Sequence, residues 1–141
     1  VPTYTGVGTG NYPRIKYLDS DRLLYTYSSN SSQQNVTVLT YSGFSITTNS
    51  TLTAQDATAI YGEIEPVSPS QAIVMSHNNT NTAKADIINI DGTTLTKPYS
   101  QLTLFSDSGN TDNYLFRLSP RKAILVGQIG GVPKYMLLDL S

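Results

Sequence analysis

Two carboxylates, Glu63 and Glu65, stand two positions apart in a segment that alternates charged and apolar residues. On a β-strand this spacing places both side chains on one face. Carboxyl pairs held about 5–10 Å apart perform glycoside hydrolysis, so this pair is a candidate for that chemistry. A similar segment earlier in the chain carries Arg14 and Lys16 at the matching positions, which favours an ordinary solvated face. We therefore expect no catalytic residues and a protein that is not an enzyme.

The run from Asp107 to Asn113 is rich in side-chain oxygen atoms. Calcium is bound by carboxylate and amide oxygens of this kind, so Asp107, Asn110 and Asp112 are candidate metal ligands. The run does not follow the EF-hand pattern, and Asp, Asn and Gly also form turns without any metal. Nothing else in the sequence predicts a cofactor.

The chain has no cysteine and a single histidine, His77. Disulfides, thiolate zinc sites and cysteine nucleophiles are therefore excluded. A Ser-His-Asp triad would have to use His77, which stands among the turn-forming residues Ser76, Asn78 and Asn79. We expect His77 to be a solvated loop residue.

Tyrosine is abundant, with 10 copies against 3 phenylalanines. A tyrosine ring packs against apolar surfaces while its hydroxyl keeps a hydrogen bond, which suits sugar stacking and protein interfaces. Packing within strands is the simpler use for any one of these residues. The candidates for ligand binding are Tyr27, Tyr41, Tyr61, Tyr99 and Tyr114.

Three segments of the chain resemble one another, at residues 18–27, 67–76 and 118–127. Each runs from an apolar residue through a Ser-, Asp- or Pro-containing turn into a mainly apolar stretch. Arg22, Gln71 and Lys122 hold the same place in the three copies, at spacings of 49 and 51 residues. The flanking segments match in the same order, so we interpret the chain as a tandem repeat.

Each unit is predicted to contain four short antiparallel strands. In the first strand Ile15 and Tyr17 alternate with Arg14 and Lys16, which is typical of a half-buried strand. The second strand is continuously apolar, so we expect it to be covered on both faces. A glycine turn then predicts a hairpin between the third strand and a threonine-rich fourth strand.

The units are expected at residues 11–59, 60–112 and 113–141, within one all-β domain spanning residues 1–141. The third unit stops after its third strand, and residues 1–10 are expected to complete a sheet of this chain or of a neighbour. Thr51–Ile60 is the one helical alternative, and its threonine content disfavours a helix.

Four-stranded units of about 50 residues are typical of propeller blades. The phrases at residues 118–126 and 132–140 resemble the degenerate propeller-type repeats of phage tail-fibre and bacterial surface adhesin proteins, and this resemblance covers roughly residues 11–141. It implies blade-like units. Three blades are fewer than the roughly four to eight of closed propellers, so the chain would pair with copies of itself, belong to a longer propeller, or close as a pseudo-threefold β-trefoil or β-prism. The absence of tryptophan counts against a trefoil lectin.

Charged residues make up only 13% of the chain, and the net charge is −1. A nucleic-acid binder would normally present a basic stripe, so we expect none of that activity. No apolar run approaches the roughly 20 residues needed to cross a bilayer, so membrane insertion is not expected. Thr, Ser, Asn and Gln instead supply 50 of the 141 residues, a neutral polar composition that suits recognition of uncharged sugars.

Four asparagines begin N-glycosylation acceptor patterns, at Asn30, Asn35, Asn49 and Asn78. Such patterns arise readily in a chain this rich in Asn, Ser and Thr, and they matter only in a eukaryotic secretory pathway or its virus. We expect all four to lie in exposed turns.

The leading hypothesis is a non-enzymatic binding module at the cell exterior or the virion surface, with a carbohydrate or surface receptor as its partner. The alternative is a structural subunit of a homo-oligomer or fibre that is completed by edge-strand pairing. An enzyme comes last, as a glycosidase fragment whose partner carboxylates lie elsewhere.

Overall fold

A computed structural model describes residues 10–29, 33–55, 59–78, 82–98, 102–106, 111–129 and 131–139. Every helix or strand within these ranges is a β-strand. All neighbouring strands pair antiparallel. The prediction of an all-β antiparallel protein is therefore confirmed.

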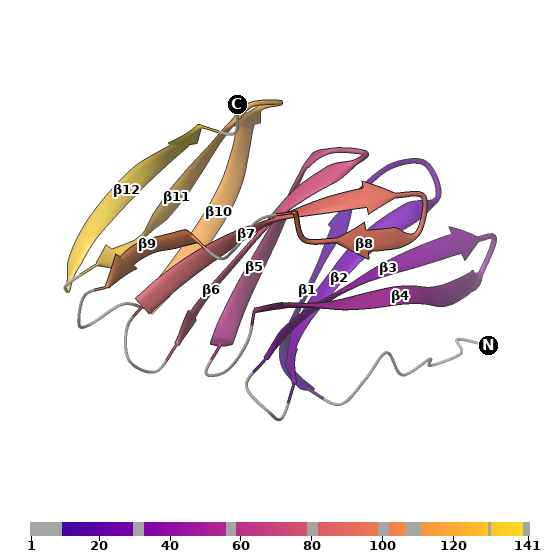
Figure 1. Cartoon of the computed structure of the whole chain (residues 1–141), viewed down its shortest axis with the longest axis horizontal. Coiled ribbons are helices and arrows are strands. Elements are labelled where there is room, and N and C mark those ends of the chain that lie inside the picture. The colour runs from indigo at the N-terminus through magenta and orange to yellow at the C-terminus, as the bar shows by residue number, and fades with distance from the viewer. Residues whose placement is uncertain are drawn as a thin grey trace.

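The strands form three separate sheets that lie side by side in chain order (Figure 1). Sheet A contains β1 (Gly10–Tyr17), β2 (Arg22–Ser29), β3 (Gln34–Ser42) and β4 (Ser45–Gln55). Sheet B contains β5 (Ala59–Ser68), β6 (Gln71–Asn78), β7 (Thr82–Asp91), β8 (Thr94–Thr96) and β9 (Leu102–Ser106). Sheet C contains β10 (Thr111–Ser119), β11 (Lys122–Ile129) and β12 (Val132–Asp139). Within the described residues no sheet closes on itself.

Glycine turns join the hairpins where the sequence predicts them. Gly43 between β3 and β4 and Gly92 between β7 and β8 both have positive φ, near 57° and 58°. Glycine adopts this left-handed conformation without steric cost, which allows the chain to reverse tightly.

The fourth position of sheet B is shared by two short strands, because both β8 and β9 pair with β7. Pro98 follows β8, and a proline has no N–H to donate to a sheet ladder. The preceding Lys97 turns instead toward Asp86 of β7, with 3.7 Å between its Nζ and Oδ1. The expected single fourth strand is thus divided at this point.

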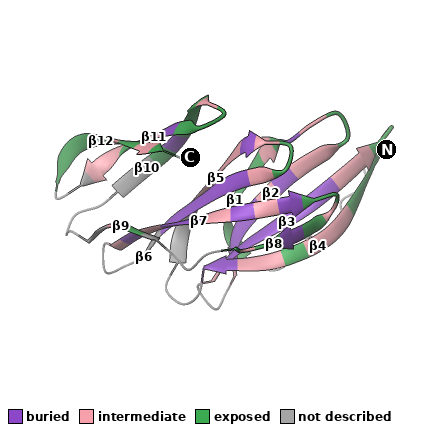
Figure 2. Ribbon diagram, turned by 45° about the horizontal axis from the view of Figure 1, so that its top comes forward, coloured by how far each residue is buried: buried purple, intermediate pink, exposed green. Residues whose placement is uncertain are grey.

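Two apolar cores lie between the sheets. The core between sheets A and B includes Leu24 and Val38 from one side and Ile64 and Val74 from the other. The core between sheets B and C unites the following residues: Val67, Ile73, Met75, Ala85, Leu115, Ala123 and Leu125. Sheet B is therefore covered by a neighbouring sheet on both faces, whereas sheets A and C are each covered by a neighbouring sheet on one face only. Figure 2 shows the difference, because β12 is largely exposed along its length.

Two expectations about burial need correction. In sheet A the first strand is not half-buried through its apolar residues, because Ile15 and Tyr17 are 54% and 63% exposed. The apolar second strand is covered on both faces only in sheet B, at β6. In β11, Val126 is 40% exposed, since nothing in the described chain packs on that face of sheet C.

Residues 51–55 and 59–60 belong to β4 and β5, so the helix that the threonine content disfavours does not form there. The expectation for the acceptor asparagines is wrong at two positions. Two of the acceptor asparagines expected in turns lie in strands, Asn35 in β3 and Asn49 in β4, and Asn35 is buried. Asn78 ends β6, and Asn30 lies outside the described residues.

Residues 1–10 are predicted to complete the third unit, and of these only Gly10 lies within the described ranges. Residues 1–9 lie outside the described ranges. Gly10 belongs to β1, where it pairs with Ser29 of sheet A. Sheet C itself has three strands, as the sequence predicts for the end of the third unit.

Candidate interaction surfaces

Sheet C presents an exposed apolar face on the side opposite sheet B. Side chains alternate across a sheet, so the neighbours of the buried Leu115 and Leu125 point away from the core. The outer face of sheet C, as defined here, consists of Tyr114, Phe116, Leu118, Ile124, Val126, Tyr135 and Leu137. Most of these side chains are large and at least 40% exposed. Such a face is unusual for a protein that stays monomeric.

The residues of this face are contiguous in the sheet. Val126 of β11 pairs in register with Tyr114 of β10 and with Tyr135 of β12. The rings of Tyr114 and Phe116 lie side by side, with 6.4 Å between their centroids and 24° between their planes. Three strands thus present one flat apolar area with Val126 near its middle.

Polar residues mark one end of the outer face. Lys122 of β11 stands opposite Asp139 of β12 in register. Opposite charges across a strand pair attract each other. A pair of opposite charges therefore borders the apolar area at this end.

The outer face of sheet A is uncovered at β1 and β2 only, because Thr37 and Leu39 of β3 on the same face are buried. It contains the exposed Ile15 and Tyr17 of β1 and the half-buried Leu23 and Tyr25 of β2. Ile15 pairs in register with Tyr25, and Tyr17 with Leu23, so these four side chains form one patch. This patch is smaller and more aromatic than its counterpart on sheet C.

A series of ionic contacts and hydrogen bonds joins the first strands of the three sheets, β1, β5 and β10. Arg14 donates to Glu63 at 2.8 Å, and Lys16 Nζ lies 2.9 Å from Glu65 Oε2. The other oxygen of Glu65 accepts the backbone N–H of Arg117 in β10 at 3.3 Å. The two carboxylates are only 12% and 17% exposed. The face predicted to be solvated is thus a contact between sheets, and its paired carboxylates serve to connect strands.

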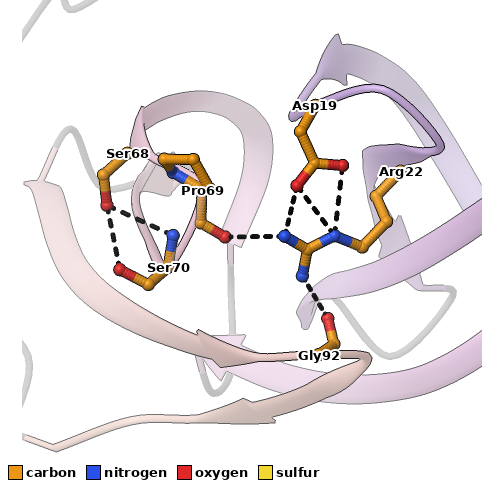
Figure 3. Close-up of polar contacts among 6 residues, drawn as sticks. All are labelled: Asp19, Arg22, Ser68, Pro69, Ser70 and Gly92. Carbon is orange, nitrogen blue, oxygen red and sulfur yellow. Dashed lines mark hydrogen bonds and ion pairs between the residues drawn. The ribbon is translucent and has the colours of Figure 1, made fainter.

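A second polar joint ties the turn of sheet A to two turns of sheet B (Figure 3). Arg22 binds the carboxylate of Asp19, with its Nε 3.0 and 3.2 Å from the two oxygens. The same guanidinium donates to the carbonyl oxygens of Pro69, at 3.2 Å, and of Gly92. The hydrogen bond and charge of Arg22 lower the pKa of Asp19 below its ordinary value of 3.8.

A buried polar layer lies at one end of the core between sheets A and B. Gln34 of β3 accepts a hydrogen bond from Ser28 at 3.0 Å and donates one to Thr26. Gly62 of β5 lies directly against this amide, since a Cβ at Gly62 would meet it at 2.1–2.3 Å. Gln55 donates to the carbonyl oxygen of Lys84 at 3.1 Å in the same layer.

The structure does not bring the predicted ligand-binding tyrosines together. Tyr27 is buried, with its ring 5.5 Å from that of Tyr25. Tyr41 donates its hydroxyl to the carbonyl oxygen of Ser20 at 2.6 Å. Burial and the neighbouring Tyr17 raise the pKa of Tyr41 above its ordinary value of 10.0. Tyr27 is therefore used in packing, and the half-buried Tyr41 is used in a hydrogen bond to the turn before β2.

Of the other three candidates, Tyr114 is half exposed and belongs to the outer face of sheet C. Tyr61 lies in β5, where only its backbone is described, and Tyr99 lies outside the described residues. The alternation of apolar residues along β10 and β12 was the signal for this face, but in the sequence it is identical to the signal of a buried one.

The candidate metal ligands are only partly covered by the structure. Asp107 and Asn110 lie outside the described residues, and only the backbone of Asp112 is described, in β10. Elsewhere in the described chain no three His, Asp or Glu side chains gather to hold a metal ion. No helix of the described residues is long and apolar enough to cross a membrane.

The sequence predicts that His77 lies in a loop, and this prediction is wrong. His77 lies in β6, where it pairs with Tyr61 and Ala83. The two pairings continue the antiparallel ladders of β6 with β5 and β7. Turn-forming neighbours did not decide its structure, because the ladder of a central strand overrides local preference.

No protein-family model, curated protein or solved structure matches this chain. The function is therefore inferred from the sheets and their surfaces.

Proposed function

We propose that this chain is a non-enzymatic assembly module that associates with further copies of itself through the outer face of sheet C. The observation that carries the proposal is the contiguous area of half-exposed apolar side chains on β10, β11 and β12. Burying a fully exposed side chain of this size contributes about 1.5–3 kcal/mol, and each half-exposed side chain contributes part of this. Several of them together offset the cost of association.

Blade-like units support this proposal. The first strand of each sheet has a register irregularity near its start, between Asn11 and Arg14 in β1, Ala59 and Tyr61 in β5, and Thr111 and Tyr114 in β10. The backbone N–H of Tyr41 donates to Asp21, and that of Ile90 donates to Ser70, in matching places of sheets A and B. These features favour a propeller-like series of equivalent sheets.

The contacts between first strands favour the same arrangement. Strand β5 contacts β1 on one side and β10 on the other. In a propeller the first strands of successive blades adjoin around an axis in this way. A series of three blades is open at both ends, so assembly would cover the faces that the single chain leaves exposed.

The test replaces the central residue of the outer face. Val126→Asp adds a charge where its side chain is already 40% exposed, so the single chain should still fold. We expect the wild type to have the mass of two or more chains in analytical ultracentrifugation and Val126→Asp to have the mass of one.

The matched control is Phe44→Asp, which removes another exposed aromatic residue, at the hairpin tip between β3 and β4. This variant should assemble as the wild type does. Circular dichroism checks that all three proteins keep their strands. A wild type with the mass of one chain at every concentration would refute the proposal.

Carbohydrate recognition is the second candidate function, in keeping with an exterior or virion-surface location. It is favoured by the exposed Tyr114 ring beside Phe116 on a face without buried charge, since aromatic faces stack on sugars. A glycan array probed with wild type and Tyr114→Ala tests it. Binding that is lost in Tyr114→Ala, at unchanged mass, would favour this function over assembly.

A further inference from the structure

The partner of the outer face of sheet C can be deduced from the two sheet contacts inside the chain, and this deduction rests on the proposed assembly function. We infer that the outer face of sheet C packs on the outer face of sheet A of a second copy. The contact is head-to-tail and continues the series in which sheet A packs on sheet B and sheet B packs on sheet C.

In each of the three sheets, equivalent residue positions form the face that is directed toward the next sheet. The spacing of 49–51 residues matches Leu18 with Val67 and Leu118. The first two are 8% and 2% exposed and lie in the two cores, whereas Leu118 is 57% exposed. A position that contacts the next sheet in sheets A and B has no next sheet to contact in sheet C.

Other positions of the same face behave alike. Leu24 and Ile73 are buried, and their counterpart Ile124 is only half-buried. Val38 of β3 is buried, and its counterpart Leu137 of β12 is exposed. The outer face of sheet C thus has the residue positions of a sheet-contacting face without the contact.

The opposite face of each sheet is directed toward the preceding sheet. On its first two strands, the side chains are buried in sheets B and C and more exposed in sheet A. Ile64 and Leu115 are buried against the preceding sheet, but their counterpart Ile15 in sheet A is exposed. Val74 and Leu125 are likewise buried, and their counterpart Tyr25 is half-buried. Sheet A therefore leaves the β1 and β2 part of this face without a preceding sheet, although Leu39 of β3 on the same face is 3% exposed.

Both contacts inside the chain join a face of the first kind to a face of the second kind. Leu24 and Ile64 share one core, and Ile73 and Leu115 share the other. The same rule pairs Ile124 of one copy with Ile15 of another. A contact of two sheet C faces would instead join two faces of the same kind, a combination that neither core contains.

A head-to-tail contact repeats until the rotation closes a ring or the series extends as a filament. Two copies would supply six sheets, within the roughly four to eight of closed propellers. Each copy then uses both of its uncovered faces, and no large apolar area of the described sheets remains exposed.

Complementation between two variants tests the inference. Val126→Asp blocks the outer face of sheet C, and Ile15→Asp blocks the outer face of sheet A. Each variant alone should self-associate about a hundredfold or more weaker than wild type, because an uncompensated charge is buried in the contact. An equimolar mixture should form a pair, since the intact sheet C face of Ile15→Asp meets the intact sheet A face of Val126→Asp.

The outcomes separate this inference from the function on which it rests. If Ile15→Asp assembles like the wild type while Val126→Asp does not, the sheet C face binds another surface and the inference is overturned, although the assembly function stands. If both variants stay single chains and their mixture does too, the head-to-tail contact is also overturned. A wild type that never assembles removes both proposals. Phe44→Asp serves again as the control that should assemble.

Discussion

Gly62 shows how a single residue sets the distance between two sheets. Its backbone in β5 contacts the amide of Gln34 in β3, and Gln34 is held by hydrogen bonds to Ser28 and Thr26. Any side chain at position 62 would occupy the space of that amide. The close approach of sheets A and B at this end therefore depends on a residue without a Cβ.

Gly62→Ala should lower the free energy of unfolding by about 2 kcal/mol, because Gln34 must leave its buried hydrogen bonds. Urea titration followed by tyrosine fluorescence measures the loss. The added change Gln34→Ala vacates the space, so the double variant should lose less than the two single losses combined. Strict additivity, or no loss in Gly62→Ala, would show that the contact is not tight.

Residues also show the limit of sequence patterns for the site. Tyr27 and Tyr114 are equally plausible ligand-binding residues by type, yet one is buried and the other is half exposed. Tyr27 stands in the second strand of sheet A, and Tyr114 stands in the first strand of sheet C. Their exposure depends on whether another sheet or neighbouring side chains cover them, which alternation along one strand does not encode.

At the scale of elements, the turns between first and second strands act as joints between sheets. The turn of residues 18–22 carries Arg22, whose guanidinium reaches the turns at Pro69 and Gly92 in sheet B. Asp19 fixes that guanidinium within its own turn. The sequence predicts a tight turn here, but its role in joining two sheets emerges only from contacts 47 and 70 residues away.

The Asp19 joint predicts a specific acid dependence. The pKa of Asp19 is lowered in the folded chain by Arg22, so its contribution to stability is present above 3.8, the ordinary value, and is lost as pH falls through the lower folded value. The side chains are partly solvated, so the effect is below about 1 kcal/mol. Asp19→Asn should lose this contribution at neutral pH and converge on wild type as pH falls below the lowered folded pKa of Asp19.

Urea midpoints at a series of pH values measure this difference. Asp91→Asn is the matched control, because Asp91 is an exposed carboxylate at the end of β7. Its stability should follow the wild type at every pH. A constant gap between Asp19→Asn and wild type down to the lowest pH would contradict the assignment.

At the scale of the whole molecule, burial declines from the centre to the ends. Sheet B is covered on both faces, and sheets A and C are covered on one. The apolar positions at the two ends are therefore the ones whose free energy changes most on assembly. The proposed assembly would couple stability to association, because only the folded chain presents the two faces.

The temperature of half-unfolding should therefore rise with protein concentration in the wild type. Val126→Asp should show no such rise, because its chains remain separate. Differential scanning calorimetry at increasing concentrations measures both proteins. A wild-type midpoint that does not move with concentration would be incompatible with assembly.

Local patterns determined the all-β antiparallel class and the glycine hairpins, because alternation and turn residues act over a few neighbouring positions. The predictions from these patterns were wrong for the loop position of His77, the exposure of Asn35 and the burial of Ile15, because distant strands determine the surroundings of these residues. Tertiary structure alone decided that Glu63 and Glu65 join sheets through cations of β1, and that sheets A and C each keep one face uncovered. The physical reason is that a period-two pattern states which side chains share a face, whereas burial of that face depends on which sheet, if any, lies against it.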